Sequence, residues 1–513
     1  MTASVPSRRF RGSLRSVALL LAVGTTTSLL PGCSGSPGES AAGDSNAQEH
    51  LQSAVQALQA DSTKTLQITA TGRWYQFGQA PAPGSAWPPF DVSNYTASLN
   101  FDAPAARVQI VRKQVVEPGR VRPVPVEQRA DQYVNGATAW NLAPPQGSPP
   151  GTAPVVQPQA AAVHERLSEI WTTPQGFLKA ATAHKARVTA TDKGAEISFT
   201  ADGHAFEGVL DAQHQVTQVK TWIDNPVLGD TLVEFQYEGY KDFNGTRFPS
   251  HIVRKQGGFP VLDLTVSGVT ANADVSLPIP AEASKVPPQV VTSEALAPGV
   301  FYLRGGTHHS VLIEQQDHLV LVEAPLNEDR SKALIAKIKE LVPSKPLRYV
   351  VNTHQHFDHS GGLRTFVDQG VIVVTHEANR PFYEEAWATP HQLEPDALAG
   401  SKRQAEFLTF KGQHVLDDGK RKIQLHELTG NGHNDAFVVV YLPAEKLLVE
   451  ADAYTPLAPG VPKPATPNPF SVNLYENIQK LKLDVRTIAA LHGPGKVELA
   501  ELENFIGWNQ AAN

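Results

Sequence analysis

The residues with the clearest chemical potential lie in one short stretch, Asn352 to Gly362, which reads NTHQHFDHSGG. Within it, His354 and His356 are two positions apart, and Asp358 and His359 are adjacent. Imidazole nitrogens and carboxylate oxygens are ligands of zinc and related transition metals. On an extended backbone the first pair can face one point, whereas the second pair on a turn can face another. The spacing therefore indicates two metal ions.

The elements around this stretch explain how its side chains could be held. The apolar run Leu347 to Val351 predicts a buried strand, and Leu363 to Asp368 predicts a short helix after the two glycines. The stretch then lies on a loop at the carboxyl end of a strand, where open α/β sheets place their ligand sites. A single histidine is usually a surface or core residue, but such a cluster at a strand end is not expected from packing alone.

Three further residues of ligand type lie in comparable positions later in the chain. His433 is in a glycine-rich loop, Asp452 ends an apolar run, and His492 follows another apolar run. The strands predicted beside them are 423–428, 446–451 and 487–491. Because each residue lies just beyond a strand, all three could meet the first cluster on one edge of a layered α/β core.

The stretch His354 to His359 resembles the H-x-H-x-D-H signature of the metallo-β-lactamase superfamily, and the resemblance covers about residues 290–513. It implies a four-layer αββα fold and a ligand set for each of two metals. The first set is His354, His356 and His433. The second set is Asp358, His359 and His492, with Asp452 bridging the two ions. Ala451 and Leu491 stand where the family commonly has glycine, which leaves every ligand position intact.

This ligand set, rich in nitrogen, suits two Zn²⁺ ions, with Fe or Mn as the alternative metals. Two dications about 3.5–4 Å apart can hold a bridging water and lower its pKa from about 16 toward 7. The resulting hydroxide would attack a carbonyl or phosphoryl centre without a serine or cysteine nucleophile. Asp358 and Asp452 are the predicted catalytic residues, because Asp358 can also orient the hydroxide and Asp452 sets the separation of the metals.

The resemblance implies a metal-dependent hydrolase of a small-molecule substrate, with an ester, lactone, thioester or related bond as its target. The β-lactamase subclasses that use a cysteine ligand are excluded, because Cys33 is the only cysteine and is remote from the cluster. Those without that cysteine usually lack the bridging aspartate, which is present here as Asp452. The alternatives are a β-lactam hydrolase and an envelope lipoprotein that binds an apolar ligand and carries an auxiliary metal domain.

The start of the chain has the layout of an export signal. Arginines precede an apolar run that begins at Val17, and Leu30-Pro31-Gly32-Cys33 resembles a bacterial lipoprotein cleavage box. Residues 1–32 are therefore predicted to be a lipoprotein signal peptide, and Cys33 is predicted to carry lipid. This implies export to the bacterial cell envelope, with the protein anchored in a membrane on its periplasmic face.

A chain of 513 residues is too long for one ordinary core, and its net charge of −7 gives no reason to expect nucleic acid as a partner. The small polar residues 33–46 predict a flexible tether, and the proline-bearing segment 276–290 predicts a linker. Between them, residues 47–275 predict a β-rich (α+β) N-terminal domain. Residues 291–513 form the predicted α/β hydrolase domain.

The N-terminal domain shows long alternating runs and a hairpin turn at Asp242 to Gly245. With helices predicted at 160–171 and 174–184, an antiparallel sheet with helices on one face is the simplest architecture. It resembles the curved half-barrel lipoprotein carriers of the bacterial envelope, which implies a groove for an apolar ligand. A spacer or docking domain without a ligand is the competing interpretation.

A few other features have less specific meanings. His308, His309, His376 and Tyr454 lie near predicted strand ends, and we expect supporting or packing roles for them rather than catalysis. Residues 387–421 read as an irregular insertion that could face the substrate.

We predict that Cys33→Ser abolishes membrane association and leaves the protein folded, because the acyl chains are the only predicted apolar anchor. Membrane fractionation after a salt wash checks this, with the unsubstituted protein as the control. Variant protein that stays in the membrane fraction would show that lipid on Cys33 is not the anchor.

Overall fold

The computed structural model describes residues 39–145, 147–149 and 151–508. Residues 44–513 form one compact unit, and both predicted domains belong to it. The predicted signal peptide and Cys33 lie outside the described residues. None of the helices in the described part of the chain is long and apolar enough to cross a membrane.

The first described element is helix α1 (Glu39–Ala57), which corrects one prediction. Residues 33–46 were expected to be a flexible tether, but from Glu39 onward the chain is helical. Leu51, Val55 and Leu58 bury their side chains in the core. Once this buried part of the helix is formed, each residue added at its N-terminal end gains one backbone hydrogen bond for a small further loss of conformational entropy. The alanine and serine residues before it therefore extend the helix toward Glu39.

The N-terminal domain is built on one antiparallel sheet of 13 strands, in the order β6-β5-β4-β3-β2-β1-β13-β12-β11-β10-β9-β8-β7. The first half consists of β1 (Thr65–Tyr75), β2 (Pro89–Asn100), β3 (Ala105–Gln114), β4 (Glu127–Asn135), β5 (Thr138–Ala143) and β6 (Val155–Pro158). The second half consists of β7 (Arg187–Thr191), β8 (Gly194–Ala201), β9 (His204–Leu210), β10 (Val216–Ile223), β11 (Thr231–Phe243), β12 (Thr246–Gln256) and β13 (Phe259–Ala271). β1 pairs with β13, which joins the two halves.

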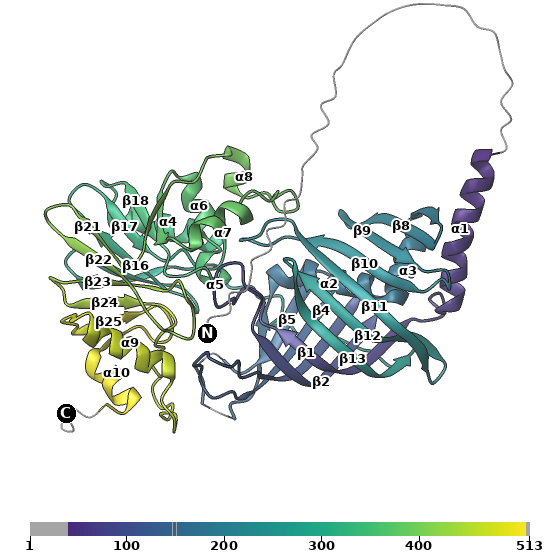
Figure 1. Cartoon of the computed structure of the whole chain (residues 1–513), viewed down its shortest axis with the longest axis horizontal. Helices are drawn as coiled ribbons and strands as arrows, with labels where there is room; N and C mark the ends of the chain where they lie inside the picture. Colours follow the sequence, from purple (N-terminus) through teal and green to yellow (C-terminus); the bar gives the residue numbers. More distant parts are fainter. Residues whose placement is uncertain (1–38, 146, 150, 509–513) are drawn as a thin grey trace, which may run out of the picture. The chain divides into compact units, whose positions relative to one another are not determined.

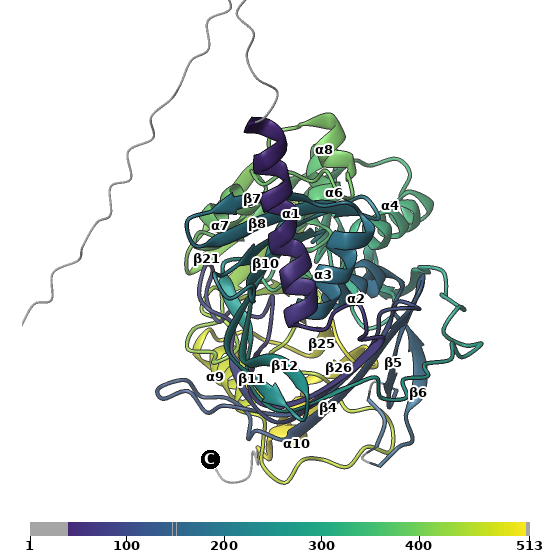
Figure 2. The same ribbon diagram turned by 90° about the vertical axis from the view of Figure 1, so that its right-hand side faces the viewer.

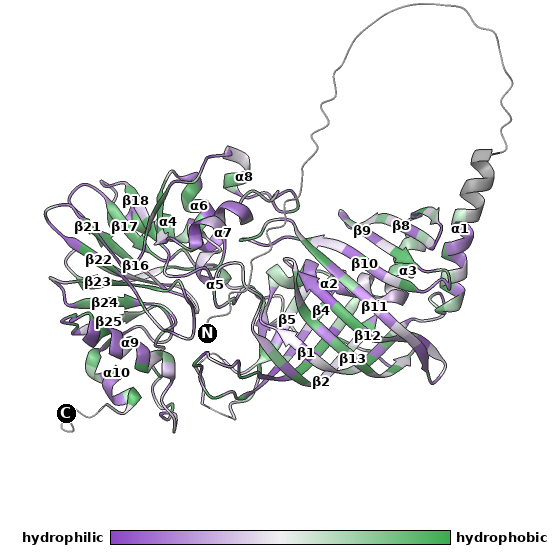
Figure 3. Cartoon of the chain, in the orientation of Figure 1, coloured by the Kyte–Doolittle hydropathy of each residue, from purple (hydrophilic) through white to green (hydrophobic). Residues whose placement is uncertain are grey.

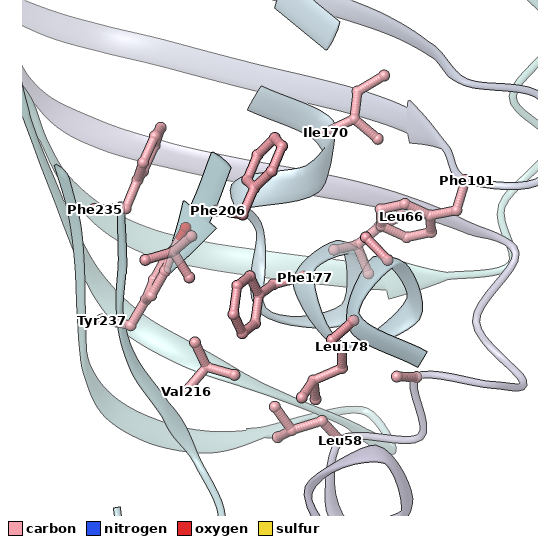
Figure 4. Close-up of a cluster of buried hydrophobic side chains, with 14 of the residues drawn as sticks. Leu58, Leu66, Phe101, Ile170, Phe177, Leu178, Phe206, Val216, Phe235 and Tyr237 are labelled. Carbon is pink, nitrogen blue, oxygen red and sulfur yellow. The ribbon is translucent and has the colours of Figure 1, made fainter. Parts of the chain in front are cut away.

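The sheet curves around the helices α2 (Val163–Thr172) and α3 (Pro174–Ala183), which follow a short 3₁₀ turn η1 (Ala160–Ala162) (Figure 2). The prediction of helices on one face of an antiparallel sheet is therefore confirmed. Figure 4 shows Phe177 and Leu178 of α3 in one core with Phe206 of β9. A Cβ atom at Gly208 would lie 2.3 Å from the Phe177 ring, so the backbone of β9 packs directly against this ring.

The C-terminal part contains two sheets. Residues 272–291 precede these sheets. The structure describes all of these residues, and they form no helix or strand. The seven-stranded sheet consists of β14 (Thr292–Ala297), β15 (Val300–Arg304), β16 (Ser310–Glu314), β17 (Leu319–Val322), β18 (Leu347–Val351), β19 (Ile372–His376) and β20 (Phe407–Phe410). The six-stranded sheet consists of β21 (Gln413–Asp417), β22 (Lys422–Glu427), β23 (Val438–Leu442), β24 (Leu447–Glu450), β25 (Thr487–Ala490) and β26 (Lys496–Glu498).

The two sheets bury their facing sides in a shared core, and helices cover the outer sides (Figure 1). The seven-stranded sheet carries α4 (Glu328–Leu341), α6 (Leu363–Asp368), α7 (Asn379–Ala386) and α8 (Ala397–Ser401). The six-stranded sheet carries α9 (Pro469–Lys480) and α10 (Leu499–Ile506). In Figure 3, α10 has both hydrophobic and hydrophilic residues, as expected for a helix with one face on a sheet. The predicted αββα layering is confirmed.

The elements that carry the metal-type residues agree closely with the sequence. β18 and α6 have the predicted bounds, and the single turn α5 (Phe357–Ser360) lies between them. The prediction of an irregular segment over 387–421 is wrong in part, because β20 and β21 are edge strands of the two sheets. Strands of four and five residues are too short to show a clear alternation of apolar and polar positions.

We predict that Phe177→Ala lowers the free energy of unfolding by about 3–5 kcal/mol, because it leaves a cavity beneath β9. Scanning calorimetry should show the loss in the transition of the N-terminal domain. Val116→Ala is the control, since Val116 is 70% exposed. An unfolding temperature unchanged by Phe177→Ala would contradict the packing described.

Candidate metal centre

The centre begins where β18 ends, in a loop whose backbone is fixed by buried polar side chains. The Asn352 amide donates a hydrogen bond of 2.7 Å to the carbonyl oxygen of His354. The hydroxyl of Tyr383 in turn donates to the Asn352 side-chain oxygen at 2.7 Å. The Thr353 N–H donates to Glu323 Oε1 at 2.7 Å. These bonds hold the backbone that carries His354 and His356.

The first group of ligand-type residues consists of His354, His356, His433 and Asp452. His354 and His356 come from the loop after β18, and His433 comes from the loop between β22 and β23. The Nε2 atoms of His354 and His433 are 3.3 Å apart. Two nitrogen ligands on a tetrahedral zinc ion with Zn–N bonds of about 2.0–2.1 Å are separated by about 3.3 Å, so this spacing fits a shared ion.

The second group consists of His308, Asp358, His359 and His492. His308 lies in the turn between β15 and β16, and His492 follows β25. The Nε2 atoms of His359 and His492 are 3.1 Å apart, and His308 Nε2 is 3.1 Å from Asp358 Oδ2. This group therefore converges in the same way as the first.

Asp452, which follows β24, lies between the two groups and presents one oxygen to each. Its Oδ2 is 2.9 Å from His433 Nε2 and 3.4 Å from His354 Nε2. Its Oδ1 is 2.7 Å from His492 Nε2 and 3.1 Å from His359 Nε2. This is the arrangement of a carboxylate that bridges two metal ions.

Hydrogen bonds on the far side of the rings orient the imidazoles, as is usual for histidine ligands of metals. His359 Nδ1 donates to Glu323 Oε2 at 2.8 Å, and His492 Nδ1 donates to the carbonyl of Thr307 at 3.0 Å. Each ring therefore turns its Nε2 atom toward Asp452 Oδ1, and the two Nε2 atoms face each other. The Asp452 carboxylate favours a positive charge at this point, which a proton on His359 or a bound metal ion would supply.

His356 points to the same conclusion for the first group. Its Nε2 donates to the carbonyl of Ala80 at 2.9 Å, which leaves the lone pair on Nδ1. That Nδ1 atom is buried and has no hydrogen-bond partner among the described residues. A buried nitrogen without a partner is costly, and a metal ion in the first group would satisfy it. The residues present therefore fit two metal ions.

The ionisation of the site is set by its crowding. Burial lowers the pKa of His354 to about 4, and it lowers the pKa of His356 well below the usual value, so both rings are neutral. Burial opposes ionisation of Asp452, but His359 and His433 hold its pKa well below the usual range. Against burial, Asp452 and Asp358 raise the pKa of His359 well above the usual range. The Asp452 carboxylate is thus charged and attracts cations.

All the ligands predicted from the sequence come together in these two groups, and their role in metal binding stays a prediction. His308 was expected to have a supporting role, but it lies among the ligand-type atoms of the second group. The reason is tertiary: the turn before β16 folds against the loop after β18. His309 is a supporting residue, since its ring bonds Gly305 N and the Gly493 carbonyl.

Three partners of the site were not identified from the sequence. Glu323 is an acidic residue directly after the apolar strand β17, which is a weak signal in the sequence. Gln79 donates to Asp358 Oδ1 at 2.8 Å, and the Ala80 carbonyl accepts from His356, both from the N-terminal domain. A glutamine and an alanine in a loop carry no signal of such a role.

Comparison with known proteins identifies a family for the C-terminal domain. Residues 303–492 match the family model described as the metallo-beta-lactamase superfamily. A search of curated proteins found no match.

Similar solved structures include a metallo-beta-lactamase from Pontibacter korlensis, with 20% identity over 42% of this chain and 98% of that chain and a TM-score of 0.32. A metallo-beta-lactamase from Hirschia baltica has 19% identity over 43% of this chain and 98% of that chain, also with a TM-score of 0.32. The rubredoxin oxygen:oxidoreductase from Desulfovibrio gigas has 14% identity over 42% of this chain and 61% of that chain, with a TM-score of 0.34.

We predict that Asp452→Asn weakens binding of the second metal and lowers the hydrolytic rate by roughly 10²-fold or more, because the reacting groups lose their fixed separation. The substitution keeps the shape of the side chain but removes the negative charge shared by both groups. Metal analysis and steady-state kinetics check this prediction. His376→Ala, outside both groups, is the control and should lose much less. Near-full activity of Asp452→Asn with two metals bound would refute the bridging role.

Proposed function

The C-terminal domain belongs to the metallo-β-lactamase superfamily over residues 303–492, and on this premise we propose that the protein is a hydrolase with two zinc ions. The observation that carries the proposal is the position of Asp452, with one carboxylate oxygen directed at each histidine group. Because three histidines contribute to each group, nitrogen ligands predominate, and this favours zinc over metals that prefer oxygen ligands.

When bound, two zinc ions would activate a water molecule as the nucleophile and polarise the bond to be cleaved. The chain's own residues supply the shape of the site. His354, His356, His359 and His492 are buried, whereas Asp358 and His433 keep part of their side chains exposed. A substrate therefore approaches from the side of the exposed residues, while the buried histidines form the floor.

Asp358 places a carboxylate, which can accept a proton, at this open face. Its Oδ1 accepts from Gln79, and its Oδ2 faces His308 and, at 3.8 Å, His359 Nε2. The low pKa of Asp358, opposed by burial and caused by His359 and His308, keeps the carboxylate charged. It can therefore orient a water molecule toward the substrate.

The proposed substrate is a small molecule with an ester, lactone, thioester or related bond. Support comes from the presence of Asp452 together with a ligand set that contains no cysteine. The proposed location is the bacterial cell envelope, with the protein anchored through lipid on Cys33. That proposal is supported by the basic and apolar start of the chain and by the sequence before Cys33.

A second candidate function is favoured by a cavity in the N-terminal domain. The cavity, of about 260 Å³, lies on the concave face of the sheet and is lined mainly by apolar residues such as Trp74 and Tyr95. Arg254, paired with Glu165 and Glu169, supplies charge at its wall. Such a cavity suits an apolar ligand with a polar end, which the protein would bind while the metal domain serves as an auxiliary part.

We expect zinc-loaded protein to hydrolyse an ester, lactone or thioester reporter, to lose this activity with a chelator and to regain it with Zn²⁺. β-Lactam and phosphodiester reporters test the other reaction classes. His359→Ala should retain one of two zinc ions, because only the second group loses a ligand. If the protein binds two zinc ions but hydrolyses none of these reporters, the binding-protein alternative is favoured.

A further inference from the structure

A loop of the N-terminal domain reaches the metal centre. It joins β1 to β2 and comprises residues 76–88, and we refer to it as the site loop. The Phe357 N–H donates to the carbonyl of Gly78 at 3.1 Å, and the Asp435 N–H donates to the carbonyl of Pro81 at 2.8 Å. Phe357 lies between the ligands of the β18 loop, and Asp435 follows His433. The site loop therefore bridges the two segments that supply the histidines of the first group.

Within this loop, the carbonyl of Ala80 fixes the orientation of a ligand. It accepts hydrogen bonds from His356 Nε2 and from the Gln355 side chain, each at 2.9 Å. A carbonyl can only accept, so the proton of the His356 ring is on Nε2 and the lone pair is on Nδ1. That lone pair is directed into the first group. Without this bond, the neutral ring could turn or change its tautomer, and the nitrogen would no longer be held for a metal.

Gln79 acts in the same way on the second group. Its Nε2 donates to Asp358 Oδ1 at 2.8 Å, so one carboxylate oxygen is engaged and the other faces His308 and His359. The amide restricts rotation of the Asp358 carboxylate and adds no charge. Gln79 is therefore a positioning residue for Asp358.

Aromatic packing holds the site loop in place. The Phe77 ring lies 5.3 Å from the Phe357 ring, and the Trp87 ring lies 5.7 Å from it, both nearly perpendicular. Gly78 has a φ of +78°, and a Cβ atom there would be 2.8 Å from the Phe357 ring. The close approach of backbone and ring at Gly78 brings the next two residues within hydrogen-bond distance of the ligands.

A second contact from the N-terminal domain holds the other ligand loop. Arg120, between β3 and β4, makes two hydrogen bonds with the Asp435 carboxylate, at 3.0 and 2.9 Å. It also donates to the carbonyl of Gly432 at 3.3 Å. His433 thus lies between two residues that the N-terminal domain holds.

We propose that the N-terminal domain is a structural part of the metal centre, in which Ala80 positions His356 and Gln79 positions Asp358. This inference rests on the proposed function, because it requires that the two groups bind metal. It differs from the interpretation of the N-terminal domain as a spacer. It assigns the site loop a direct effect on metal affinity, which can be measured without a substrate.

The first test is Gln79→Met in the full chain, which keeps the length of the side chain and removes its donor. Loss of a hydrogen bond that orients a metal ligand typically lowers metal affinity by roughly 10- to 100-fold. We therefore expect weaker binding of one Zn²⁺ ion in competition with a chromogenic chelator, and an altered visible spectrum of the Co²⁺-substituted protein. Gln76→Met, the same change earlier in the loop, is the matched control and should leave both readouts unchanged.

The second test displaces the loop backbone. Gly78→Val forces a side chain against the Phe357 ring, and it should weaken binding of both metals because Ala80 and Gln79 move together. Gly84→Val is the matched control: Gly84 also has a positive φ, of +72°, but a Cβ atom there would meet no described atom within 4 Å. Both glycine variants therefore carry similar backbone strain, and only one presses on the site.

The outcomes separate the inference from the function on which it rests. If the unsubstituted chain binds two metals and both test variants bind them with unchanged affinity, the inference is wrong and the proposed hydrolase stands. If the unsubstituted chain binds no Zn²⁺ or Co²⁺, both are wrong. Selective weakening in Gln79→Met, with an unfolding temperature equal to that of Gln76→Met, would support a positioning role rather than a general loss of structure.

Discussion

The architecture of the site depends on one electrostatic constraint, the convergence of four imidazole nitrogens on the two oxygens of Asp452. Glu323 and the Thr307 carbonyl accept hydrogen bonds from the Nδ1 atoms of His359 and His492. Both Nε2 atoms therefore face Asp452 Oδ1. The negative charge of Asp452 favours a positive charge at this point, which a proton on His359 or a metal ion would supply. The folded chain thus presents an arrangement that two cations stabilise, and metal binding should in turn stabilise the fold.

The layered fold satisfies this constraint by placing loops from both sheets at one edge. His354, His356, Asp358 and His359 follow β18 of the seven-stranded sheet. Asp452 follows β24 and His492 follows β25, two parallel neighbours of the six-stranded sheet. Because the facing sides of the two sheets are apolar and closely packed, the strand ends are held rigidly, and precise positioning of the ligands follows from the core rather than from the loops themselves.

The N-terminal domain extends this scaffold rather than standing apart from it. Its large sheet holds a cavity on the concave face, and the loop between its first two strands reaches the ligands. The interface between the two domains provides aromatic packing at Phe357 and hydrogen bonds to His356 and Asp358. The relative position of the two domains is therefore coupled to the geometry of the centre. Any movement of one domain against the other would change the environment of the metals.

The sequence by itself determined the ligand cluster and the strand before it, because these depend on local spacing and on apolar periodicity. The αββα class was implied by the resemblance to the metallo-β-lactamase superfamily. The sequence also indicated that His433, Asp452 and His492 follow strands. Only the tertiary structure decided that His308 joins the second group. It also decided that the carbonyl of Ala80, 276 positions from His356, accepts a hydrogen bond from the His356 ring. A backbone carbonyl is present at every residue and therefore has no sequence signature. Its role depends on where the fold brings it, and that is decided by long-range packing.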